Sequence, residues 1–355
     1  MKGLILSGGK GSRLRPLTHT RAKQLIPIAN KPNLYYVVED LVAAGITDIG
    51  VIISPETGEE IRQSLGSGDR WGVSFTFIVQ DEPLGLAHAV KTARGFLGDE
   101  PFVMYLGDNL LSGGIAHLVE EYDRTRPDSI VLLTEVTNPS RFGVAELDEN
   151  GKVLRLVEKP KNPPSNLALV GVYLFGPAIH PVIDRLQPSW RGEYEITDAI
   201  QGLIDAGKAV TAHLVRGWWK DTGKPEDLLE ANRLVLSQVA RDVRGEVVDS
   251  ELAGEVVVEP GARIVRSEVR GPAHIAAGAL IQDAYVGPYT SIGRDARVVG
   301  SEVEYSILLD EAELCRLPCR VDASVIGQAV RVEATGGTRR NTVQLVLGDR
   351  SQVRL

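Results

Sequence analysis

The segment Leu4-Ile5-Leu6-Ser7-Gly8-Gly9-Lys10-Gly11-Ser12-Arg13-Leu14 joins a short apolar run to a loop rich in glycine and basic side chains. We expect the apolar run to form a buried strand. The glycines of the loop would let backbone N–H groups approach phosphate oxygens without obstruction by Cβ atoms, and an arginine guanidinium could donate two parallel hydrogen bonds to the same phosphate. The spacing fits neither a Walker A loop nor a dinucleotide fingerprint. Glycines also make ordinary strand-to-helix turns, but the arginines and Lys23 close behind favour phosphate binding.

Residues 1–240 alternate strand-like and helix-like runs. Apolar side chains recur at the spacing of one helix face over residues 34–42, and Gly45 follows where a helix-ending glycine belongs. The alternation predicts an α/β fold, with a mostly parallel Rossmann-like sheet covered by helices on both faces. Ligands of such sheets bind at the carboxyl ends of the strands. The expected strands are 3–6, 49–54, 75–79, 102–106 and 130–134.

Residues 142–176 interrupt this rhythm. The runs 142–147 and 153–158 predict a hairpin with its turn at Asn150-Gly151. A strand over 169–175 follows, and the segment reads as a lid inserted on the same sheet. We expect helices near 194–206 and 225–239, with a strand near 210–216 between them.

After about residue 245 the helical pattern stops, and apolar positions repeat every 17 residues. Small residues or Asp fall three positions after each member of the first series, where tight corners leave little room. This repeat predicts a parallel β-helix of hexapeptide type; a strand-rich sandwich is the alternative. The three series are Val258, Ile275, Ile292, Leu309; Ile264, Ile281, Val298, Cys315; and Val269, Val286, Val303.

The length of 355 residues agrees with two domains. We predict a catalytic domain over 1–240 and a β-helix domain over 241–355, with 336–355 as a terminal capping coil.

Composition excludes several classes of protein. The net charge of −8, with no basic run, makes nucleic acid an unlikely partner. Cys315 and Cys319 form a C-x3-C pair without the further ligands of a zinc site, so we expect buried free thiols. No stretch approaches the roughly 18 apolar residues of a membrane span, and the first apolar run is too short for a signal peptide. We therefore expect a soluble, cytoplasmic protein that binds no membrane.

Two acidic motifs follow expected strands. Asp108 in Leu106-Gly107-Asp108-Asn109 and Asp221 in Trp218-Trp219-Lys220-Asp221-Thr222-Gly223 both lie where loops should converge. Carboxylates at such places can hold Mg²⁺, although Asp and Asn also serve as ordinary turn or helix-cap residues. Together they suggest a divalent-metal pair.

Two further motifs carry weaker evidence. Val157-Glu158-Lys159-Pro160 would bring an adjacent acid and base into the lid, or form a plain surface ion pair. In Gln80–Ala87, the Gln80 amide could both donate to and accept from a pyrimidine base, and Gly85 would let the base approach the backbone. The same residues could equally form an ordinary loop.

In this order the motifs resemble those of the sugar-1-phosphate nucleotidylyltransferases, in particular the longer glucose-1-phosphate thymidylyltransferases with a left-handed β-helix. The resemblance covers nearly the whole chain. It rests on G-G-x-G-x-R-L-x-P-L-T at 8–18, K-Q-L-x-P-I at 23–28, G-L-A at 85–87, L-G-D-N at 106–109, E-K-P at 158–160, R-G-E-x-E-I-T-D at 191–198 and D-T-G at 221–223.

The resemblance implies Mg²⁺-dependent transfer of a nucleoside monophosphate from dTTP to glucose 1-phosphate, and we expect a homo-oligomer. The residues implied in catalysis are Arg13, Lys23, Asp108, Lys159 and Asp221, of which Asp108 and Asp221 would hold the metal. Those implied to bind the nucleotide are Leu6, Gly8, Gly9, Gly11, Arg13, Lys23, Gln24, Gln80, Pro83, Gly85, Leu86 and Asp108. Those implied to bind the sugar phosphate are Asn109, Gly143, Glu158, Lys159, Val170, Tyr173 and Arg191.

The chain departs from the family pattern in three places. Phe142 stands where tyrosine is frequent, Lys220 replaces an aliphatic residue of the shorter enzymes, and Asn30-Lys31-Pro32 lacks an aspartate often found before the lysine. The first two leave the sugar preference open.

Three other activities stay open. One methyl group, about 0.8 kcal/mol of burial, separates thymine from uracil, so UTP is an alternative donor. A non-catalytic regulatory homologue would be expected to lose acidic ligands or the loop arginine, which are present here. Acyl transfer on the β-helix would need a general base such as His274.

Overall fold

A computed structural model describes residues 1–334 and 342–354, and the chain divides into two compact units. Unit 1 comprises Met1–Gly9 and Asn33–Asp221, and unit 2 comprises Lys10–Pro32 and Thr222–Leu355. The predicted fold class, an α/β sheet followed by a β-helix, is confirmed. The division by compactness differs from a single cut at residue 240, because residues 10–32 group with the β-helix.

Unit 1 is built on a nine-stranded sheet, in which β10-β9-β11-β6-β1-β4-β5 form one path and β8 and β12 continue from β11. The predicted strands form: β1 (Lys2–Leu6), β4 (Asp48–Ile53), β5 (Ser74–Val79), β6 (Phe102–Leu106), β8 (Ser129–Glu135), β11 (Leu167–Phe175) and β12 (Val210–Leu214). β1, β4, β5 and β6 are parallel, whereas β11 runs antiparallel to β6 and β8. The sheet is therefore mixed.

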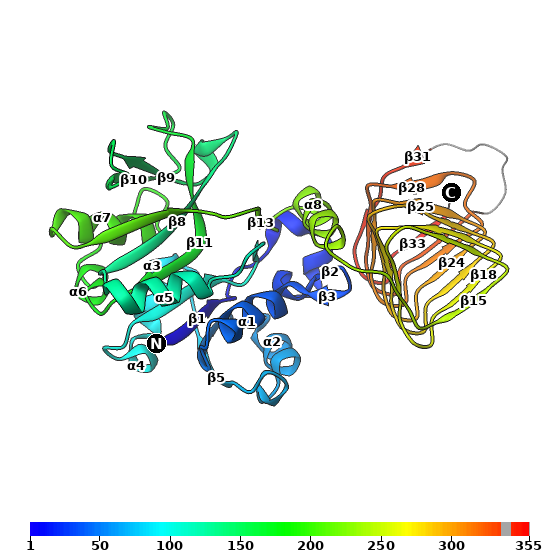
Figure 1. Cartoon of the computed structure of the whole chain (residues 1–355), viewed down its shortest axis with the longest axis horizontal. Coiled ribbons are helices and arrows are strands. Elements are labelled where there is room, and N and C mark those ends of the chain that lie inside the picture. The colour runs from blue at the N-terminus through cyan, green and yellow to red at the C-terminus, as the bar shows by residue number, and fades with distance from the viewer. Residues whose placement is uncertain (335–341, 355) are drawn as a thin grey trace. The chain divides into compact units, whose positions relative to one another are not determined.

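Helices cover both faces of this sheet (Figure 1). α3 (Leu86–Thr92), α6 (Ile179–Ile183) and α7 (Ile196–Asp205) share one apolar cluster with alternate residues of β1 and β6. On the opposite face α1 (Asn33–Ala43) contacts α5 (Ala116–Thr125), and the fully buried Tyr105 of β6 donates its hydroxyl to Asp40 of α1 at 2.8 Å. The remaining helices of unit 1 are α2 (Gly58–Leu65), α4 (Arg94–Leu97) and the short 3₁₀ turns η4 (Asp69–Trp71) and η5 (Pro139–Arg141).

The predicted hairpin is present as β9 (Gly143–Leu147) and β10 (Val153–Glu158), which pair antiparallel and extend the edge of the sheet. β11 beside it carries an irregularity, since its register with β8 shifts between Leu169 and Tyr173. A second ribbon was not predicted. β7 (Asn109–Leu111) pairs with β13 (Trp219–Asp221), segments far apart in sequence.

The coils of the β-helix stack as three parallel sheets (Figure 1). Valine and isoleucine side chains of successive coils meet in its core, and the left-handed backbone of Gly261, Gly278 and Asp295 confirms the predicted tight corners. The first sheet contains β14 (Asp242–Val243), β17 (Val256–Val258), β20 (Ala273–Ile275), β23 (Thr290–Ile292), β26 (Ile307–Leu308), β29 (Val325–Ile326) and β32 (Val346–Leu347). The second contains β15 (Glu246–Val248), β18 (Arg263–Val265), β21 (Leu280–Gln282), β24 (Arg297–Val299), β27 (Glu313–Cys315), β30 (Arg331–Glu333) and β33 (Gln352–Arg354). The third contains β16 (Glu251–Ala253), β19 (Glu268–Arg270), β22 (Tyr285–Val286), β25 (Glu302–Glu304), β28 (Arg320–Asp322) and β31 (Thr342–Val343).

The 17-residue register fails in its fourth members, because Ile292 pairs with Leu308 rather than Leu309, and Val298 with Leu314 rather than Cys315. The chain is one residue shorter between Val303 and Leu308 than in the preceding coil, which moves Leu308 and Leu314 one position earlier than the repeat requires. Leu314 is fully buried, and Cys315 lies on the outward side.

The expectation of buried thiols is therefore wrong. Cys315 and Cys319 are both free and half-buried. The residues 335–341 of the predicted capping coil lie outside the described residues, while β31, β32 and β33 continue the three sheets.

Unit 2 also contains α8 (Pro225–Leu236) and the segment 10–32. That segment comprises the 3₁₀ turns η1 (Ser12–Leu14), η2 (Leu17–His19) and η3 (Lys23–Leu25) and a small hairpin of β2 (Pro27–Ile28) and β3 (Lys31–Pro32). Within the described part of the chain, no helix is both long and apolar enough to cross a membrane.

The shifted register can be tested by truncating neighbouring side chains. Leu314→Ala should lower the free energy of unfolding by about 2–5 kcal/mol, because it empties a core position. Cys315→Ala should cost less than about 1 kcal/mol, since its side chain faces outward. Chemical denaturation of both variants measures the difference; equal losses, or a larger loss for Cys315, would contradict the register described here.

Candidate active site

The carboxyl ends of the parallel strands bring several predicted residues of unit 1 to one edge of the sheet. Leu6 pairs with Leu106 across β1 and β6, and the Gly107 N–H donates to the Leu6 carbonyl at 3.0 Å. Gly8 and Gly9 therefore leave the sheet beside Asp108. Gln80 leaves it after β5, and its Oε1 would lie 3.4 Å from a Cβ atom at Gly8.

Pairing of β7 with β13 brings the two predicted metal ligands to this edge. Asp221 lies directly opposite Asn109, the residue that follows Asp108 in the chain. Asp108 is buried and Asp221 half-buried. Two carboxylates fit Mg²⁺, which commonly takes one or two of them and completes its octahedron with phosphate oxygens and water. No group of three or more Asp, Glu, His or Cys side chains suited to a metal occurs among the described residues.

Asn109 organises the surroundings of Asp108. Its Oδ1 accepts hydrogen bonds from the Gly171 N–H at 3.2 Å and from Trp219 Nε1 at 2.7 Å, while its Nδ2 donates to Asp108 Oδ1 at 3.3 Å. A Cβ atom at Gly171 would lie 2.6 Å from the Asn109 oxygen, so only glycine fits there. The Asn109 carboxamide thus ties β7 to β13 and to β11, and sets the position of Asp108.

The predicted sugar-phosphate residues form an acid–base cluster at the end of β10. Glu158 Oε1 lies 3.2 Å from Lys159 Nζ and 3.5 Å from Arg191 Nη1. Arg191 also contacts Glu193 at 2.8 Å and Glu195 at 3.1 Å. Since acids already neutralise both cations, an incoming phosphate would compete for them with these carboxylates.

The floor of this cluster contains Tyr173 and Gly143. Burial, and secondarily Glu158, raises the pKa of Tyr173, so its hydroxyl stays protonated and can donate. A Cβ atom at Gly143 would lie 2.6 Å from Thr197 and 3.2 Å from Glu158 Oε2, which explains the glycine. Val170 lies in the irregular part of β11, where the ladder with β8 is interrupted, as bulges near active sites often are.

Gln80 is held in one orientation by His88, which the sequence analysis missed. Gln80 Nε2 lies 2.8 Å from His88 Nδ1 and 3.4 Å from the Gly85 carbonyl. Burial, and secondarily Lys91, lowers the pKa of His88, which favours the neutral ring that can accept from the amide. The sequence signal available was a polar residue in the first turn of α3, three positions after Gly85.

The loop that contains Pro83, Gly85 and Leu86 is attached to the strand-like segment before α7. Tyr194 N–H donates to the Leu84 carbonyl at 2.7 Å, and Ala87 N–H donates to the Tyr194 carbonyl at 3.1 Å. Gly85 has φ of +104°, and a Cβ atom there would lie 2.5 Å from the Tyr194 carbonyl oxygen. The predicted base loop and the Arg191 segment are therefore one connected structure.

The remaining predicted residues belong to unit 2. Gly11 has φ of +62°, and a Cβ atom there would lie 3.1 Å from Lys23 Cβ, so η1 and η3 are in close contact. Thr18 Oγ1 donates to the Gly11 carbonyl at 2.8 Å. Arg13 is exposed, whereas Gln24 is buried. A glycine turn of this kind presents Arg13 and leaves its guanidinium accessible.

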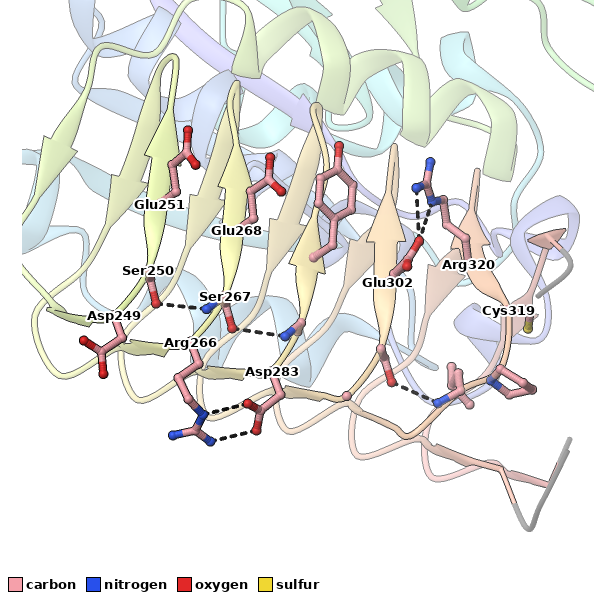
Figure 2. Close-up of a pocket in the computed structure, with 16 residues that line it drawn as sticks. Asp249, Ser250, Glu251, Arg266, Ser267, Glu268, Asp283, Glu302, Cys319 and Arg320 are labelled. Atoms are coloured by element: carbon pink, nitrogen blue, oxygen red, sulfur yellow. Dashed lines mark hydrogen bonds and ion pairs between the residues drawn. The ribbon is translucent and has the colours of Figure 1, made fainter. Parts of the chain in front are cut away.

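A groove of about 1270 Å³ runs along one corner of the β-helix (Figure 2). Its floor is made of serines whose hydroxyls are used by the corners: Ser250 accepts from the Ser267 N–H at 3.0 Å, and Ser267 from the Ala284 N–H at 3.1 Å. Arg266–Asp283 and Arg320–Glu302 ion pairs form its walls (Figure 2). Among the described residues that line this groove there is no histidine, and the Ser250 and Ser267 hydroxyls accept backbone N–H groups of the next coil.

Comparison with known proteins identifies the family. The family model described as nucleotidyl transferase matches residues 2–238. This chain belongs to the nucleotidyl transferase family.

Two relatives of this nucleotidyl transferase match it over the whole chain. A glucose-1-phosphate thymidylyltransferase of Streptomyces antibioticus is 50% identical over 357 residues, which cover 100% of this chain and 99% of the relative. A low-salt glycan biosynthesis nucleotidyltransferase of Haloferax volcanii is 49% identical over 358 residues, with 100% of both covered.

Two solved structures match about two thirds of this chain. One, described as a glucose-1-phosphate thymidylyltransferase from Bacillus anthracis in complex with sucrose, is 41% identical with a TM-score of 0.63, over 66% of this chain and 94% of the other. A UDP-glucose pyrophosphorylase complexed with UDP-glucose is 28% identical with a TM-score of 0.60, over 67% and 98%. The match to the nucleotidyl transferase family model, over residues 2–238, includes all the predicted site residues described above.

Removing the His88 ring should weaken nucleotide binding by freeing Gln80. We expect His88→Ala to raise the nucleotide KM about three- to tenfold, the size of one lost hydrogen bond, with the sugar-phosphate KM unchanged. Because the pKa of His88 is lowered, its neutral form is lost only as pH falls below the ordinary value of about 6.5. Wild-type nucleotide KM should therefore rise at low pH, and steady-state kinetics against pH would show no such rise in His88→Ala. A parallel rise in both proteins contradicts the assignment.

Proposed function

We propose that this nucleotidyl transferase transfers a thymidylyl group from dTTP to glucose 1-phosphate, releasing pyrophosphate. The observation that supports it most is the β7–β13 pairing, in which Asp221 lies opposite Asn109, the residue that follows Asp108. The relative from Streptomyces antibioticus, which matches the whole chain, is named a glucose-1-phosphate thymidylyltransferase, and this is the activity proposed here.

The reaction needs no nucleophile from the protein. A phosphate oxygen of glucose 1-phosphate attacks the α-phosphorus of dTTP in line, a new P–O bond forms, and the bond to the β-phosphate breaks so that pyrophosphate leaves. Both reactants are anions, so the task of the enzyme is to neutralise charge and align them. Mg²⁺, held by Asp108 and Asp221, would supply positive charge to the phosphates.

Each cluster of side chains then has a task in substrate binding. Gln80 Oε1 would accept the N3–H of thymine, since His88 already occupies the amide nitrogen. The loop with Gly8, Gly9, Gly11 and Arg13, together with Lys23 and Gln24, would hold the triphosphate. Glu158, Tyr173 and the irregular backbone at Val170 would bind sugar hydroxyls, and Lys159 and Arg191 would bind the sugar phosphate.

Lys159 has a backbone feature that agrees with this role. Its φ is +40°, a conformation that costs a non-glycine residue energy and recurs at functional sites. The Lys159 N–H donates to the Phe142 carbonyl at 3.0 Å, which holds the residue in place. Phe142 in turn packs edge-on against Trp219, with ring centroids 5.6 Å apart, so the lysine is linked to the strand that contains Asp221.

Substitution of one acidic and one basic residue tests the mechanism. Asp108→Asn and Lys159→Ala should each lower turnover at least about a hundredfold, the scale of losing one fixed charge or donor in a transition state. Pyrophosphate release with dTTP, glucose 1-phosphate and Mg²⁺ is the assay. Lys208→Ala removes a lysine paired with Asp128 on the surface and is the matched control. Near-normal turnover of either variant at saturating substrate would refute its role, and an inactive wild-type chain would favour a regulatory homologue.

UTP is the second candidate donor. The structural relative complexed with UDP-glucose is the observation that favours UTP. Thymine and uracil differ by one methyl group. We expect kcat/KM to be higher for dTTP than for UTP by roughly three- to fivefold, the value of one buried methyl. Steady-state rates with both nucleotides measure the ratio, and a ratio below one would assign UTP.

A further inference from the structure

The segment 10–32 ends in a turn that its own sequence does not favour. Ile28 pairs with Lys31 across β2 and β3, so Ala29 and Asn30 form a two-residue loop. Both have left-handed backbone, with φ of +47° and +60°. Such loops normally contain Asn-Gly, and an alanine there is strained by its Cβ atom. Strained turns persist where the surroundings hold them.

Asn232 of α8 is one group that holds this turn. It is fully buried, and its Oδ1 accepts from the Ala29 N–H at 2.8 Å and from Ser291 Oγ at 2.7 Å. Its Nδ2 donates to the Tyr289 carbonyl at 3.0 Å. One side chain therefore connects the turn to the β-helix coil that contains β23.

Asn30 makes the second connection. Its Nδ2 donates to the carbonyl oxygens of His274 at 3.1 Å and Ile292 at 3.0 Å, which belong to β20 and β23. These strands are neighbours in the first sheet of the β-helix. The turn is therefore bound to two successive coils.

The middle of the segment is fixed to the last described coils. Thr20 Oγ1 donates to Asp349 Oδ2 at 2.8 Å, and the Arg21 guanidinium contacts both Gln328 and Asp349. Asp349 also accepts from the Gln328 N–H at 2.8 Å. A Cβ atom at Gly348 would lie 3.0 Å from Pro16 Cβ, so Pro16 packs against this coil as well.

Lys23 and Gln24 lie between these two sets of anchors in sequence. Gly11 packs against Lys23, so the glycine turn that precedes Arg13 is positioned by the same anchored segment. The regular structure of segment 10–32 consists of three short 3₁₀ turns and a six-residue hairpin. A segment of this kind depends on its neighbours for a defined position.

We propose that the β-helix positions the nucleotide-phosphate loop, with Asn30 and Asn232 as positioning residues. This inference rests on the proposed function, in which residues 8–13, Lys23 and Gln24 bind the triphosphate. The sugar-phosphate cluster of Glu158, Lys159 and Arg191 makes its ion pairs inside unit 1. Weakening the anchors should therefore affect the two substrates differently, since misplacing binding groups by about 1 Å is enough to reduce rate and affinity.

Asn30→Gly is the sharpest test, because glycine adopts the left-handed conformation freely and only the two side-chain hydrogen bonds are lost. Asn232→Ala is the second variant, which frees the Ala29 N–H. Ser267→Ala is the matched control. It removes part-buried hydrogen bonds of similar kind, to the Val265 carbonyl at 2.8 Å and from the Ala284 N–H at 3.1 Å, neither of which involves a residue of segment 10–32.

We expect Asn30→Gly and Asn232→Ala each to raise the KM and the calorimetric Kd for dTTP about three- to tenfold, with the KM for glucose 1-phosphate changed less than about twofold. Hydrogen exchange of peptides from residues 10–32 should be faster in both variants. Ser267→Ala should leave all three measurements at their wild-type values, even if its unfolding midpoint falls.

Two outcomes overturn the inference alone, provided that the wild-type chain releases pyrophosphate. One is an unchanged dTTP affinity in Asn30→Gly; the other is an equal rise in both KM values in both variants. A wild-type chain that releases no pyrophosphate with dTTP or UTP refutes the proposed function, and the inference with it.

Discussion

The parallel pairing of β1 with β6 is the constraint on which the rest of unit 1 depends. Because Leu6 lies opposite Leu106, the strands end together, and the glycines after one leave the sheet beside Asp108 after the other. A shift of one residue in this ladder would turn buried side chains to the opposite face and separate the glycines from the carboxylate. The helices that cover both faces maintain the register, because alternate residues of β1 and β6 are buried on each side.

Charge pairing is the second organising feature, and it explains how basic residues can gather in a chain of net charge −8. Arg191 contacts three carboxylates, one of which also contacts Lys159, so both cations are already paired before any phosphate arrives. Burial raises the pKa of Glu195, and its ion pair with Arg191 favours the ionised form of this carboxyl group. Preformed pairs of this kind orient the cations in advance, and orientation is what an electrostatic mechanism requires.

Local patterns predicted the sheet, its helices and the β-helix, since each depends on periodicity within a short window. Val258, Ile275 and Ile292 stack as the 17-residue repeat requires. The repeat failed at Leu309 and Cys315 because a coil one residue shorter cannot be recognised without the pairing itself.

The sequence did not predict the pairing of β7 with β13, because it joins segments more than a hundred residues apart whose turn-like residues have other local explanations. The role of His88 in holding Gln80 depends on side-chain directions that spacing alone does not give. The predicted homo-oligomer and the left-handed coil remain predictions.

The strained Ala29–Asn30 turn connects the segment 10–32 to the β-helix within unit 2. A β-helix has little internal freedom, because each coil is hydrogen-bonded to the next along three sheets. A phosphate-binding loop is the opposite kind of structure, with glycines for close approach and few buried contacts of its own. Bonding such a loop to the backbone of a stiff stack gives it a fixed position without filling its phosphate-facing side with apolar groups. An appended β-helix can in this way contribute to a reaction even where it contacts no substrate.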